Sequence, residues 1–423
     1  MHQRLEVMKR MYKLDSCVWE ITLACCFSCK YCGSKAGKAR ENELTTGECL
    51  DIASQLAALG CGRVSLIGGE VFMRNDWDMI VEALAEKGIK VAIITNGYMF
   101  TDKIIEKLKA SRIESVAVSL DGPEAIHDKY RQPGSFKRAN DAIDILVGNG
   151  IPVSVISTLN SENVLYLETF YEYLKTKPIG AWQIQACSPM GNAADQAMNH
   201  CFDFQKVIDF VQSNAYTAPF MMGIGDNIGY YTEGEGFLRG NLNGKAKFVG
   251  CNAGLTSIGI DSVGNVRGCE SMYDDCFIEG NLREKSLGEI WNDPDAFSYN
   301  RKFHKGLLTG ACSTCPHGEI CAGGCRSYNY FTHGKLYESV ACAKNKANYE
   351  NKEEKNMTIK FSETKLCGLP NGGVEVANDE DVLIFDGGAL RPKPAGNEKP
   401  EGGVVLPEEP LAGSGEGMSK EAM

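Results

Sequence analysis

Short apolar segments alternate six times with longer amphipathic segments in the first half of this 423-residue chain. The apolar segments have the length of strands, and the amphipathic segments have the period of helices. Parallel strands need a long connection such as a helix, so this alternation predicts an α/β fold with a parallel sheet. The strands are expected at 17–23, 63–69, 90–97, 115–122, 151–160 and 181–187. The helices are expected at 45–60, 76–88, 102–111, 137–150, 165–176 and 201–213.

Each predicted strand ends in a turn of small or polar residues: LACC, IGGE, TNGY, SLDGP, STLN and CSPMG. In βα barrels the carboxyl ends of the strands form the face that carries the active site. The first of these turns opens the segment ACCFSCKYCGS at residues 24–34, which holds four cysteines within eight positions. We therefore expect the chemistry of this protein at the end of its first strand.

The chain contains 18 cysteines, and what they do depends on the compartment. The N-terminal segment MHQRLEVMKRMYK has basic residues with no apolar stretch behind them, so it is not typical of a secretion signal. No apolar run reaches the length of a membrane span. We therefore expect a cytoplasmic protein whose reduced thiols bind metal or act in catalysis. The formal net charge of −11 argues against binding to nucleic acid or to anionic membranes.

Cys25, Cys29 and Cys32 have the spacing C-x3-C-x2-C. Three thiolates can hold three irons of a 4Fe–4S cluster and leave the fourth iron open, whereas an electron-transfer cluster normally takes four. An open coordination position distinguishes a catalytic metal site from a structural one. The alternative for this segment is a zinc knuckle that recruits Cys26 or Cys17 as its fourth ligand.

From about residue 220 the strand–helix alternation ends, and glycines and then cysteines become frequent. A segment with so little periodic apolar sequence has a small core and needs additional ties such as metal. Seven cysteines follow in a fixed pattern: Cys251, then Gly264-x4-Cys269, then Cys312-x2-Cys315-x5-Cys321-x3-Cys325, and finally Cys342. A zinc ribbon on the Cys312–Cys315 pair would leave five of these cysteines unexplained.

With these motifs the chain resembles the radical S-adenosylmethionine (SAM) superfamily, whose partial βα barrel begins with the same cysteine spacing after its first strand. The resemblance implies that Cys25, Cys29 and Cys32 hold the SAM-binding cluster. It also implies that Tyr31 contacts the adenine, and that a Gly-Gly-Glu motif holds the amino group of SAM. Two glycines allow close backbone approach, and a carboxylate pairs with an ammonium. The residues implied in SAM binding besides Tyr31 are Gly68, Gly69, Glu70, Asn96, Ser119, Asp121 and Arg131.

The second cysteine group is similar to the SPASM domain, the auxiliary-cluster extension of maturases of subtilosin, pyrroloquinoline quinone, anaerobic sulfatase and mycofactocin. The resemblance implies a first auxiliary 4Fe–4S cluster on Cys251, Cys269 and Cys325. It implies a second on Cys312, Cys315, Cys321 and Cys342. The expected fold is thus a partial (β/α)6 TIM-like barrel with a C-terminal cysteine-rich iron–sulfur domain. The expected ranges are an N-terminal extension (1–14), the barrel (15–220), a linker (221–250), the SPASM domain (251–350) and an acidic tail (351–423).

The first auxiliary cluster is one ligand short of the usual four. Cys276 is the nearest spare thiol, and it either completes this cluster or is an inert packed cysteine. We expect Cys26 to be a packed thiol, because free cysteine is among the most buried residue types. The same default applies to Cys17, Cys49, Cys61, Cys187, Cys201 and Cys367.

The resemblance implies that SAM is cleaved reductively to methionine and a 5′-deoxyadenosyl radical, which takes a hydrogen from an unactivated carbon. Relatives with this extension mostly modify peptides or proteins, so cross-linking of a ribosomally made peptide is the leading hypothesis. A second hypothesis is a sulfatase-maturing enzyme that makes formylglycine. In that branch an acid after the cysteine numbered 269 here acts as base, and this chain has Glu270. A third, from another class, is a non-catalytic iron–sulfur electron carrier, which would not produce 5′-deoxyadenosine.

The implied partners are a peptide or protein substrate and a reductant such as flavodoxin or ferredoxin. Many relatives carry a leader-binding domain before the barrel, but here the first strand is expected by residue 17. We therefore expect either a separate leader-binding protein or none. The tail is rich in Gly, Pro and acidic residues, so it is expected to be largely disordered, with brief order near 374–385.

Overall fold

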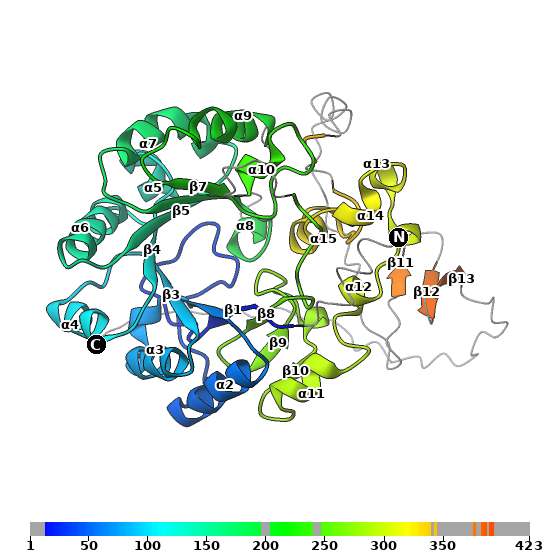
Figure 1. The fold of residues 1–423 in the computed structure, drawn as a ribbon, viewed down its shortest axis with the longest axis horizontal. Helices are drawn as coiled ribbons and strands as arrows, with labels where there is room; N and C mark the ends of the chain where they lie inside the picture. The colour runs from blue at the N-terminus through cyan, green and yellow to red at the C-terminus, as the bar shows by residue number, and fades with distance from the viewer. Residues whose placement is uncertain are drawn as a thin grey trace, which may run out of the picture.

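The computed structural model describes residues 13–195, 204–239, 247–339 and 342–344, and the backbone of three short strands between 375 and 392. Cys201 and Cys367, two of the cysteines expected to be packed, lie outside these residues. Figure 1 shows a curved sheet with helices around its outer side. Among the described helices, none is both long enough and apolar enough to cross a bilayer.

Ten strands form one sheet in the order β10-β9-β8-β1-β2-β3-β4-β5-β6-β7. From β1 to β7 each strand runs parallel to its neighbour, which confirms the predicted α/β fold class. The six predicted strands are β1 (Ser16–Glu20), β2 (Arg63–Ile67), β3 (Lys90–Thr95), β4 (Ser115–Ser119), β5 (Val153–Leu159) and β6 (Ala181–Ala186). A seventh parallel strand, β7 (Met221–Ile224), was not predicted, because it is only four residues long and contains a glycine.

The helices follow the strands as the periodicity predicts. They are α2 (Thr46–Ala58), α3 (Trp77–Glu86), α4 (Asp102–Ala110), α6 (Ser135–Gly148), α7 (Leu167–Leu174) and α9 (Phe204–Asn214). Shorter pieces lie between them: η1 (Val71–Met73), α5 (Glu124–Tyr130), η2 (Asn163–Tyr166), α8 (Asn192–Asp195) and α10 (Glu235–Leu238). Side-chain caps fix where helices begin: Thr45 and Glu48 form a capping box at α2, and Thr101 caps α4.

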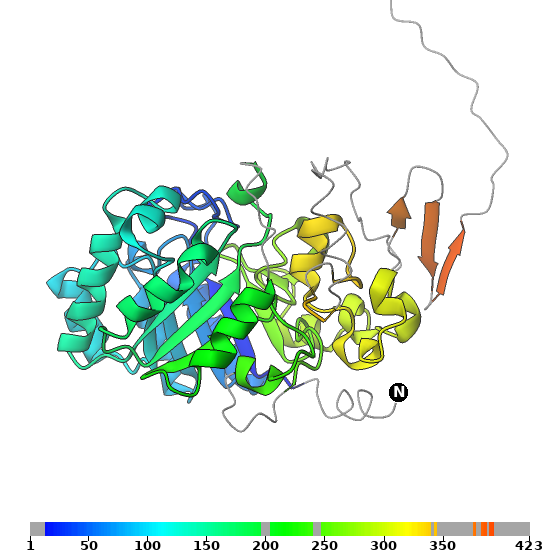
Figure 2. The ribbon, with the colours of Figure 1, turned by 90° about the horizontal axis from the view of Figure 1, so that it is seen from above.

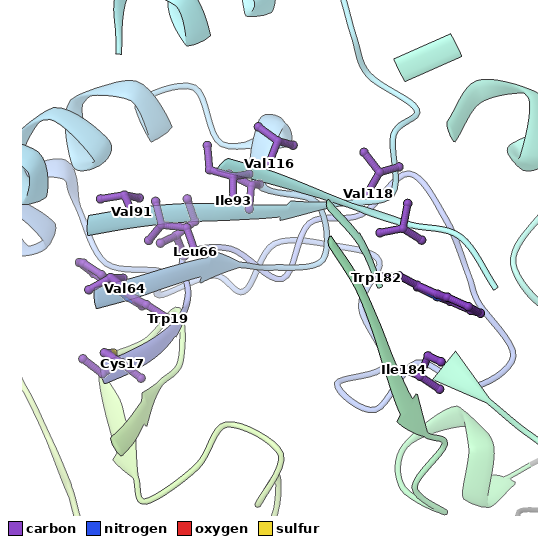
Figure 3. Close-up of a cluster of buried hydrophobic side chains, with 14 of the residues drawn as sticks. Cys17, Trp19, Val64, Leu66, Val91, Ile93, Val116, Val118, Trp182 and Ile184 are labelled. Carbon is purple, nitrogen blue, oxygen red and sulfur yellow. The ribbon is translucent and has the colours of Figure 1, made fainter. Parts of the chain in front are cut away.

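The two faces of the parallel sheet differ in character. The face toward the helices is packed: Trp182 on β6 lies against the rings of Phe170, Tyr171 and Phe210 from α7 and α9. Figure 3 shows this buried set along the strands, including Cys17, Trp19, Val64, Leu66, Ile93, Val118 and Ile184. Strand residues alternate between faces, so the intervening residues point into the barrel. These inward residues are mostly half-exposed. Many are small or polar, among them Ser65, Ala92, Ser154, Thr158, Gln185 and Gly223, and three are isoleucines, at positions 67, 94 and 156.

The C-terminal cysteine-rich region extends the same sheet. Its strand β8 (Ser257–Ile260) pairs in parallel with β1, and β9 (Asn265–Arg267) and β10 (Gly280–Asn281) follow antiparallel. Arg283 fastens the region to α2 by donating to Glu48 at 2.5 and 3.0 Å. The short helical pieces are η3 (Asp275–Phe277), α11 (Leu287–Asn292), α12 (Ser298–Arg301), η4 (Lys305–Leu307), α13 (Gly310–Ser313), α14 (Gly318–Cys321) and α15 (Arg326–His333). Figure 2 shows the yellow helices of this region beside the barrel.

Three strands are described in the tail: β11 (Glu375–Ala377), β12 (Val382–Asp386) and β13 (Ala389–Pro392). They form a separate antiparallel sheet in the order β11-β12-β13. The segment 374–385, where brief order was expected, contains β11 and most of β12. The rest of the tail lies outside the described residues.

Candidate active site

The first cysteine group lies on a loop whose two ends are tied together at the carboxyl end of β1. The backbone N–H of Cys25 donates to the carbonyl of Gly37 at 2.9 Å, and Gly37 donates to Leu23 at 3.1 Å. Asn192 donates to the carbonyls of Cys29 and Cys32, both at 2.9 Å. The loop therefore presents Cys25, Cys29 and Cys32 from a closed frame, at the strand end where the active site was predicted.

The thiols of this loop suit an iron–sulfur cluster. Backbone N–H groups of Phe27 and Ala36 donate to the sulfurs of Cys25 and Cys32 at 3.4 and 3.3 Å, which favours thiolate ligands. Burial raises the pKa of Cys29 to about 11, so this thiol ionises when a cation is present. Within the described ranges no three His, Cys, Asp or Glu side chains converge on one metal ion. A 4Fe–4S cluster instead takes one thiolate at each iron, which this spaced trio provides.

Cys26 differs from the packed thiol that we expected. It is half-exposed, and the Asn96 side-chain amide lies 3.5 Å from its sulfur and 3.9 Å from that of Cys25. Hydrogen bonding from Cys25 lowers the pKa of Cys26, and Asn96 lowers it further. Cys26 therefore shares the Asn96 amide with Cys25 instead of packing in the core. By contrast Cys17, Cys49, Cys61 and Cys187 are buried, as expected.

The Gly-Gly-Glu motif lies against the start of the cysteine loop. Gly69 and Glu70 donate their N–H groups to the carbonyls of Thr22 and Ala24 at 2.8 and 2.7 Å. A Cβ on Gly69 would come within 2.2 Å of the Ala24 carbonyl oxygen, and one on Gly68 within 2.6 Å of that of Thr22. Both positions therefore require glycine so that the end of β2 can reach the backbone that leads into the cysteines.

Glu70 is buried at the carboxyl ends of β2 and β3. Its carboxylate accepts hydrogen bonds from the Thr95 hydroxyl and the Asn96 N–H, both at 2.8 Å, and from the Phe72 N–H at 3.4 Å. Burial raises its pKa to about 7, although these donors favour the charged form. Glu70 is therefore poised to ionise when a cationic group such as an ammonium arrives.

This state of Glu70 makes a prediction for SAM binding. An ammonium favours the ionised carboxylate, so SAM binding should release a proton near pH 7, and affinity should rise as the pH rises through about 7. Glu70→Gln should weaken SAM binding about tenfold to a hundredfold, the value of a charge-assisted hydrogen bond. Isothermal titration in two buffers of different ionisation enthalpy measures both effects. Thr95→Val, which removes one donor but no charge, is the milder control. Lost iron with unchanged SAM affinity would make Glu70 a structural residue.

The Asp121 carboxylate accepts hydrogen bonds from three separate segments around the site. The Tyr31 hydroxyl and the Arg131 Nε donate to its Oδ2, and the Thr158 N–H donates to its Oδ1 at 2.9 Å. Burial opposes the charge of Asp121, but Arg131 outweighs it and lowers the pKa. His127 lies behind it and accepts the Asp121 N–H at 3.2 Å. Asp121 is thus satisfied by protein groups, and it ties the cysteine loop to β4 and β5.

Some residues that shape this site were not found from the sequence. Glu43 accepts the Leu23 N–H at 2.7 Å and the Thr22 hydroxyl at 2.9 Å, which fixes the entry to the cysteine loop. Asn192 and Thr95 likewise act on residues distant in the chain. No local motif marks these residues, because each contacts a partner that is distant from it in the chain. Ser119 is buried at the end of β4, on the inward side.

The three cysteines expected to share the first auxiliary cluster are electrostatic neighbours. Burial raises the pKa of Cys269 to about 12, and the proximity of Cys251 raises it further. Burial also raises the pKa of Cys325, as do Cys251 and Cys269. Thiols that are crowded and reluctant to ionise without a cation fit a cluster site.

Cys276 lies in η3, after a short loop that follows Cys269. Its N–H donates to Asp274 Oδ1 at 3.0 Å, and its sulfur lies 3.8 Å from the Tyr330 hydroxyl on α15. Tyr330 also donates to Asp274 Oδ2 at 3.1 Å. The Tyr330 hydroxyl thus gives its one hydrogen to Asp274 and accepts from the Cys276 thiol, so Cys276, Asp274 and Tyr330 form one polar cluster.

We expect Cys276→Ala to change the Mössbauer and electron paramagnetic resonance signals assigned to the first auxiliary cluster, because the cluster would lose its fourth protein ligand. Tyr330→Phe, which keeps the thiol and removes its hydroxyl neighbour, should produce a smaller shift of the same signal. Unchanged spectra and full turnover in Cys276→Ala would show that the cysteine is neither ligand nor catalyst.

The four cysteines expected at the second auxiliary cluster line one pocket. It is lined by Tyr230, Tyr231, Cys312, Cys315, His317, Cys321, Cys342, Lys344 and smaller residues. The N–H of Ser339 donates to the Cys312 sulfur at 3.3 Å. Burial raises the pKa of Cys321 to about 12, and its neighbours Cys342 and Cys312 raise it further. The structure thus brings all four thiols around one space, which fits a cluster.

Glu270 is buried directly after Cys269. Neither of its carboxylate oxygens has a hydrogen-bond partner among the described residues. Burial raises its pKa well above the usual range, and the nearby Glu20 raises it further. A Cβ on Gly259 would come within 2.4 Å of the Glu270 backbone nitrogen and 2.7 Å of one of its carboxylate oxygens, so the glycine on β8 makes room for the backbone and side chain of Glu270. An unpaired buried carboxylate is costly, which is typical of a functional group kept for a ligand.

Glu20, by contrast, has partners of its own. Arg40 donates to its Oε1 at 2.5 Å, and the Tyr273 hydroxyl donates to its Oε2 at 3.3 Å. Arg40 also contacts Tyr273 and Ser262. This network joins β1 and the first cysteine loop to the C-terminal region. Its members Glu20 and Arg40 are also electrostatic neighbours of Glu270.

Comparison with known proteins agrees with these sites. Residues 19–174 match the family model of the radical SAM superfamily, and residues 251–316 match that of the SPASM iron–sulfur cluster-binding domain. An AdoMet-dependent heme synthase of Methanosarcina barkeri is 28% identical over 340 residues, covering 76% of this chain and 93% of that protein. The mycofactocin maturase MftC of Mycolicibacterium smegmatis is 29% identical over 321 residues, covering 74% and 78%. Streptococcus suis SuiB, crystallised with its precursor peptide SuiA, shares the fold at a TM-score of 0.62 and 18% identity, covering 79% of this chain and 76% of SuiB.

Proposed function

Because this chain is a radical SAM enzyme with a C-terminal SPASM iron–sulfur domain, we propose that it matures a ribosomally made peptide by forming a cross-link. When bound, an iron–sulfur cluster and SAM supply a 5′-deoxyadenosyl radical that takes hydrogen from an unactivated carbon. The residues of the chain must bind SAM, hold the substrate carbon in reach and exclude water. The observation that carries the peptide proposal is the uncharged inner face of the barrel.

From the middle of the strands to their carboxyl ends, the inward side chains of β2 to β7 are serine, threonine, glutamine, alanine, isoleucine and glycine. The inward-pointing cations of these strands, Arg63 and Lys90, are the first residues of β2 and β3. Both pair with Glu114, at 3.0 and 3.3 Å. At the rim Arg131 is bound by Asp121. Hydroxyl and amide side chains match the neutral donors and acceptors of a peptide backbone.

The heme synthase relative raises a rival substrate, a tetrapyrrole. Tetrapyrroles carry carboxylates, and a buried carboxylate needs cationic or multiple hydrogen-bond partners. The inward residues of β2 to β7 provide no cation near the proposed SAM site. Glu270, a buried acid beside β8 with no hydrogen-bond partner among the described residues, would repel an anion. The inner face therefore favours a peptide over a tetrapyrrole, in line with the similarity to mycofactocin maturase.

Glu270 is proposed as the base of this reaction. It lies next to Cys269, a proposed ligand of the first auxiliary cluster, and its carboxylate is free to take a proton from the substrate. The same group would serve formylglycine formation on a Cys or Ser residue, which is the second candidate. The products distinguish the two. A cross-link joins two residues with loss of hydrogens, whereas formylglycine is an aldehyde, formed from Ser by loss of two hydrogens and from Cys by loss of two hydrogens and exchange of its sulfur for the oxygen of water.

Ten cysteines in two groups, with or without Cys276, are proposed to hold three 4Fe–4S clusters. The loop with Cys25, Cys29 and Cys32 would hold the SAM-binding cluster, and the C-terminal groups would hold the two auxiliary clusters. The proposed partners are a peptide or protein substrate and a reductant of the flavodoxin or ferredoxin type, with a separate leader-binding protein where the substrate has a leader. Anaerobically reconstituted protein should then contain about 12 irons.

The test is a direct comparison of substrates. Reconstituted enzyme is reduced with dithionite and given SAM, with either a candidate peptide deuterated at one side-chain carbon or an iron–coproporphyrin. Peptide-dependent deuterium in 5′-deoxyadenosine and a cross-linked product by mass spectrometry would support the proposal. Turnover of the porphyrin and none of the peptide would overturn it. No 5′-deoxyadenosine under any condition would favour the non-catalytic electron carrier.

A further inference from the structure

The four-cysteine pocket is bordered by an exposed basic rim. Phe248 is buried with its ring 4.7 Å from that of Tyr230, in a small apolar cluster with Cys321 and Cys342. Its neighbours Lys247 and Val249 are exposed, and Val249 is one of the more exposed apolar side chains, at 46%. The buried phenylalanine thus fixes a lysine and an apolar side chain at the surface next to the pocket.

Lys344 approaches the same pocket from another segment. It lines the pocket with the cysteines, and it is exposed. The hydroxyl of Tyr231, another lining residue, donates to the Phe248 carbonyl at 2.6 Å, so the segment that carries Lys247 is tied to the same pocket. We call Lys247, Val249 and Lys344 the pocket rim.

The two lysines of the pocket rim carry exposed positive charges. Neither Lys247 nor Lys344 forms an ion pair with a described residue, whereas Lys35 in the first cysteine loop is paired with Asp195 at 2.6 Å. The chain as a whole carries a net charge of −11. Two exposed lysines that form no ion pair among the described residues, together with an exposed valine, would attract an acidic partner.

We propose that the pocket rim docks an acidic electron-transfer protein of the flavodoxin type beside Cys312, Cys315, Cys321 and Cys342. The inference rests on the proposed function, in which these four cysteines hold the second auxiliary cluster. Electron-transfer complexes are small and transient, so a few charges around an apolar contact are enough to form one. A substrate peptide would instead need a long groove with many polar contacts, and the rim offers only a short patch beside one pocket.

The location separates this surface from the SAM site. The thiols of the first loop face Asn96 and the buried Arg131, within the barrel, where SAM is expected to cover them. The pocket rim lies instead beside the second cysteine group, where a partner could approach without displacing SAM or the substrate. Docking at the rim and catalysis in the barrel are therefore compatible.

The test measures binding of a purified acidic flavodoxin with oxidised FMN to the reconstituted enzyme. The dissociation constant of the wild type should rise with salt, since the attraction is between exposed charges. The double variant K247E/K344E should raise it about tenfold or more by replacing attraction with repulsion. The matched control is K103E/K109E, which makes the same charge change at two exposed lysines of α4. The control should change the constant by less than about twofold.

The other readouts separate this inference from the proposed function. Iron content and dithionite-driven 5′-deoxyadenosine formation should be the same in the wild type and both variants, because dithionite needs no docking surface. Flavodoxin binding that is lost in K103E/K109E and retained in K247E/K344E would overturn the proposal, as would wild-type enzyme that does not bind flavodoxin. Loss of peptide binding alone in K247E/K344E would assign the rim to the substrate and also overturn it. Wild-type protein that lacks the second auxiliary cluster but still binds flavodoxin through the rim would contradict the cluster assignment and leave docking intact.

Discussion

Enzyme in which Cys25, Cys29 and Cys32 are all replaced by alanine should lose about four of roughly 12 irons and all cleavage of SAM. The three residues lie on a loop closed by the Cys25–Gly37 hydrogen bond. None of them belongs to the cysteine groups proposed to hold the auxiliary clusters. The eight or so irons assigned to the C-terminal region should remain. Iron analysis of anaerobically reconstituted protein and chromatography of 5′-deoxyadenosine measure the two effects.

The matched control is Cys61→Ala. Cys61 is a buried thiol that donates to the Arg63 carbonyl at 3.3 Å and takes no part in a proposed cluster. This variant should keep all its iron and its SAM cleavage, with a small loss of stability from the removed packing. Zinc in place of iron in anaerobically purified wild-type protein would contradict the assignment and return the zinc knuckle as the explanation of the triad.

The sequence was most informative where one local pattern reports on one structural role. Strand–helix alternation located six of the seven strands from β1 to β7, because a buried strand must be apolar and its crossover helix amphipathic. It missed β7 and the strands β8 to β10, which have two to four residues each and owe their position to pairing with distant strands. The joining of β8 to β1 places the cysteine-rich region on the barrel sheet itself, and no local period could report that.

The same distinction holds at the site. Spacing identified the cysteine groups, and the matches to the radical SAM and SPASM families confirm that resemblance. Spacing did not show that the two glycines of the motif make room for the Thr22 and Ala24 carbonyls, or that Asp121 is occupied by protein donors. It also misjudged Cys26, since packing depends on what the other strand ends bring near, here the Asn96 amide.

The second large effect is expected when Glu270, the proposed general base, is replaced. Glu270→Gln keeps the shape of the side chain but removes its ability to accept a proton, so product formation should fall by about 10²–10⁴-fold, the usual contribution of a general base. SAM cleavage without product should persist, because Glu270 lies with the C-terminal region and takes no part in the proposed SAM site. Mass spectrometry of the peptide and chromatography of 5′-deoxyadenosine separate the two outcomes.

The sign of the pH dependence follows from burial. Glu270 works as a base only when ionised, and burial raises its pKa, so wild-type product formation should rise with pH through that value while the Gln variant lacks this rise. A carboxylate with a raised pKa also lowers folding stability as the pH rises above its unfolded value of about 4.3. The Gln variant avoids this loss, so its melting temperature at neutral pH should equal or exceed that of the wild type. A lower melting temperature with normal product formation would instead make Glu270 a structural residue of the β8–β9 region.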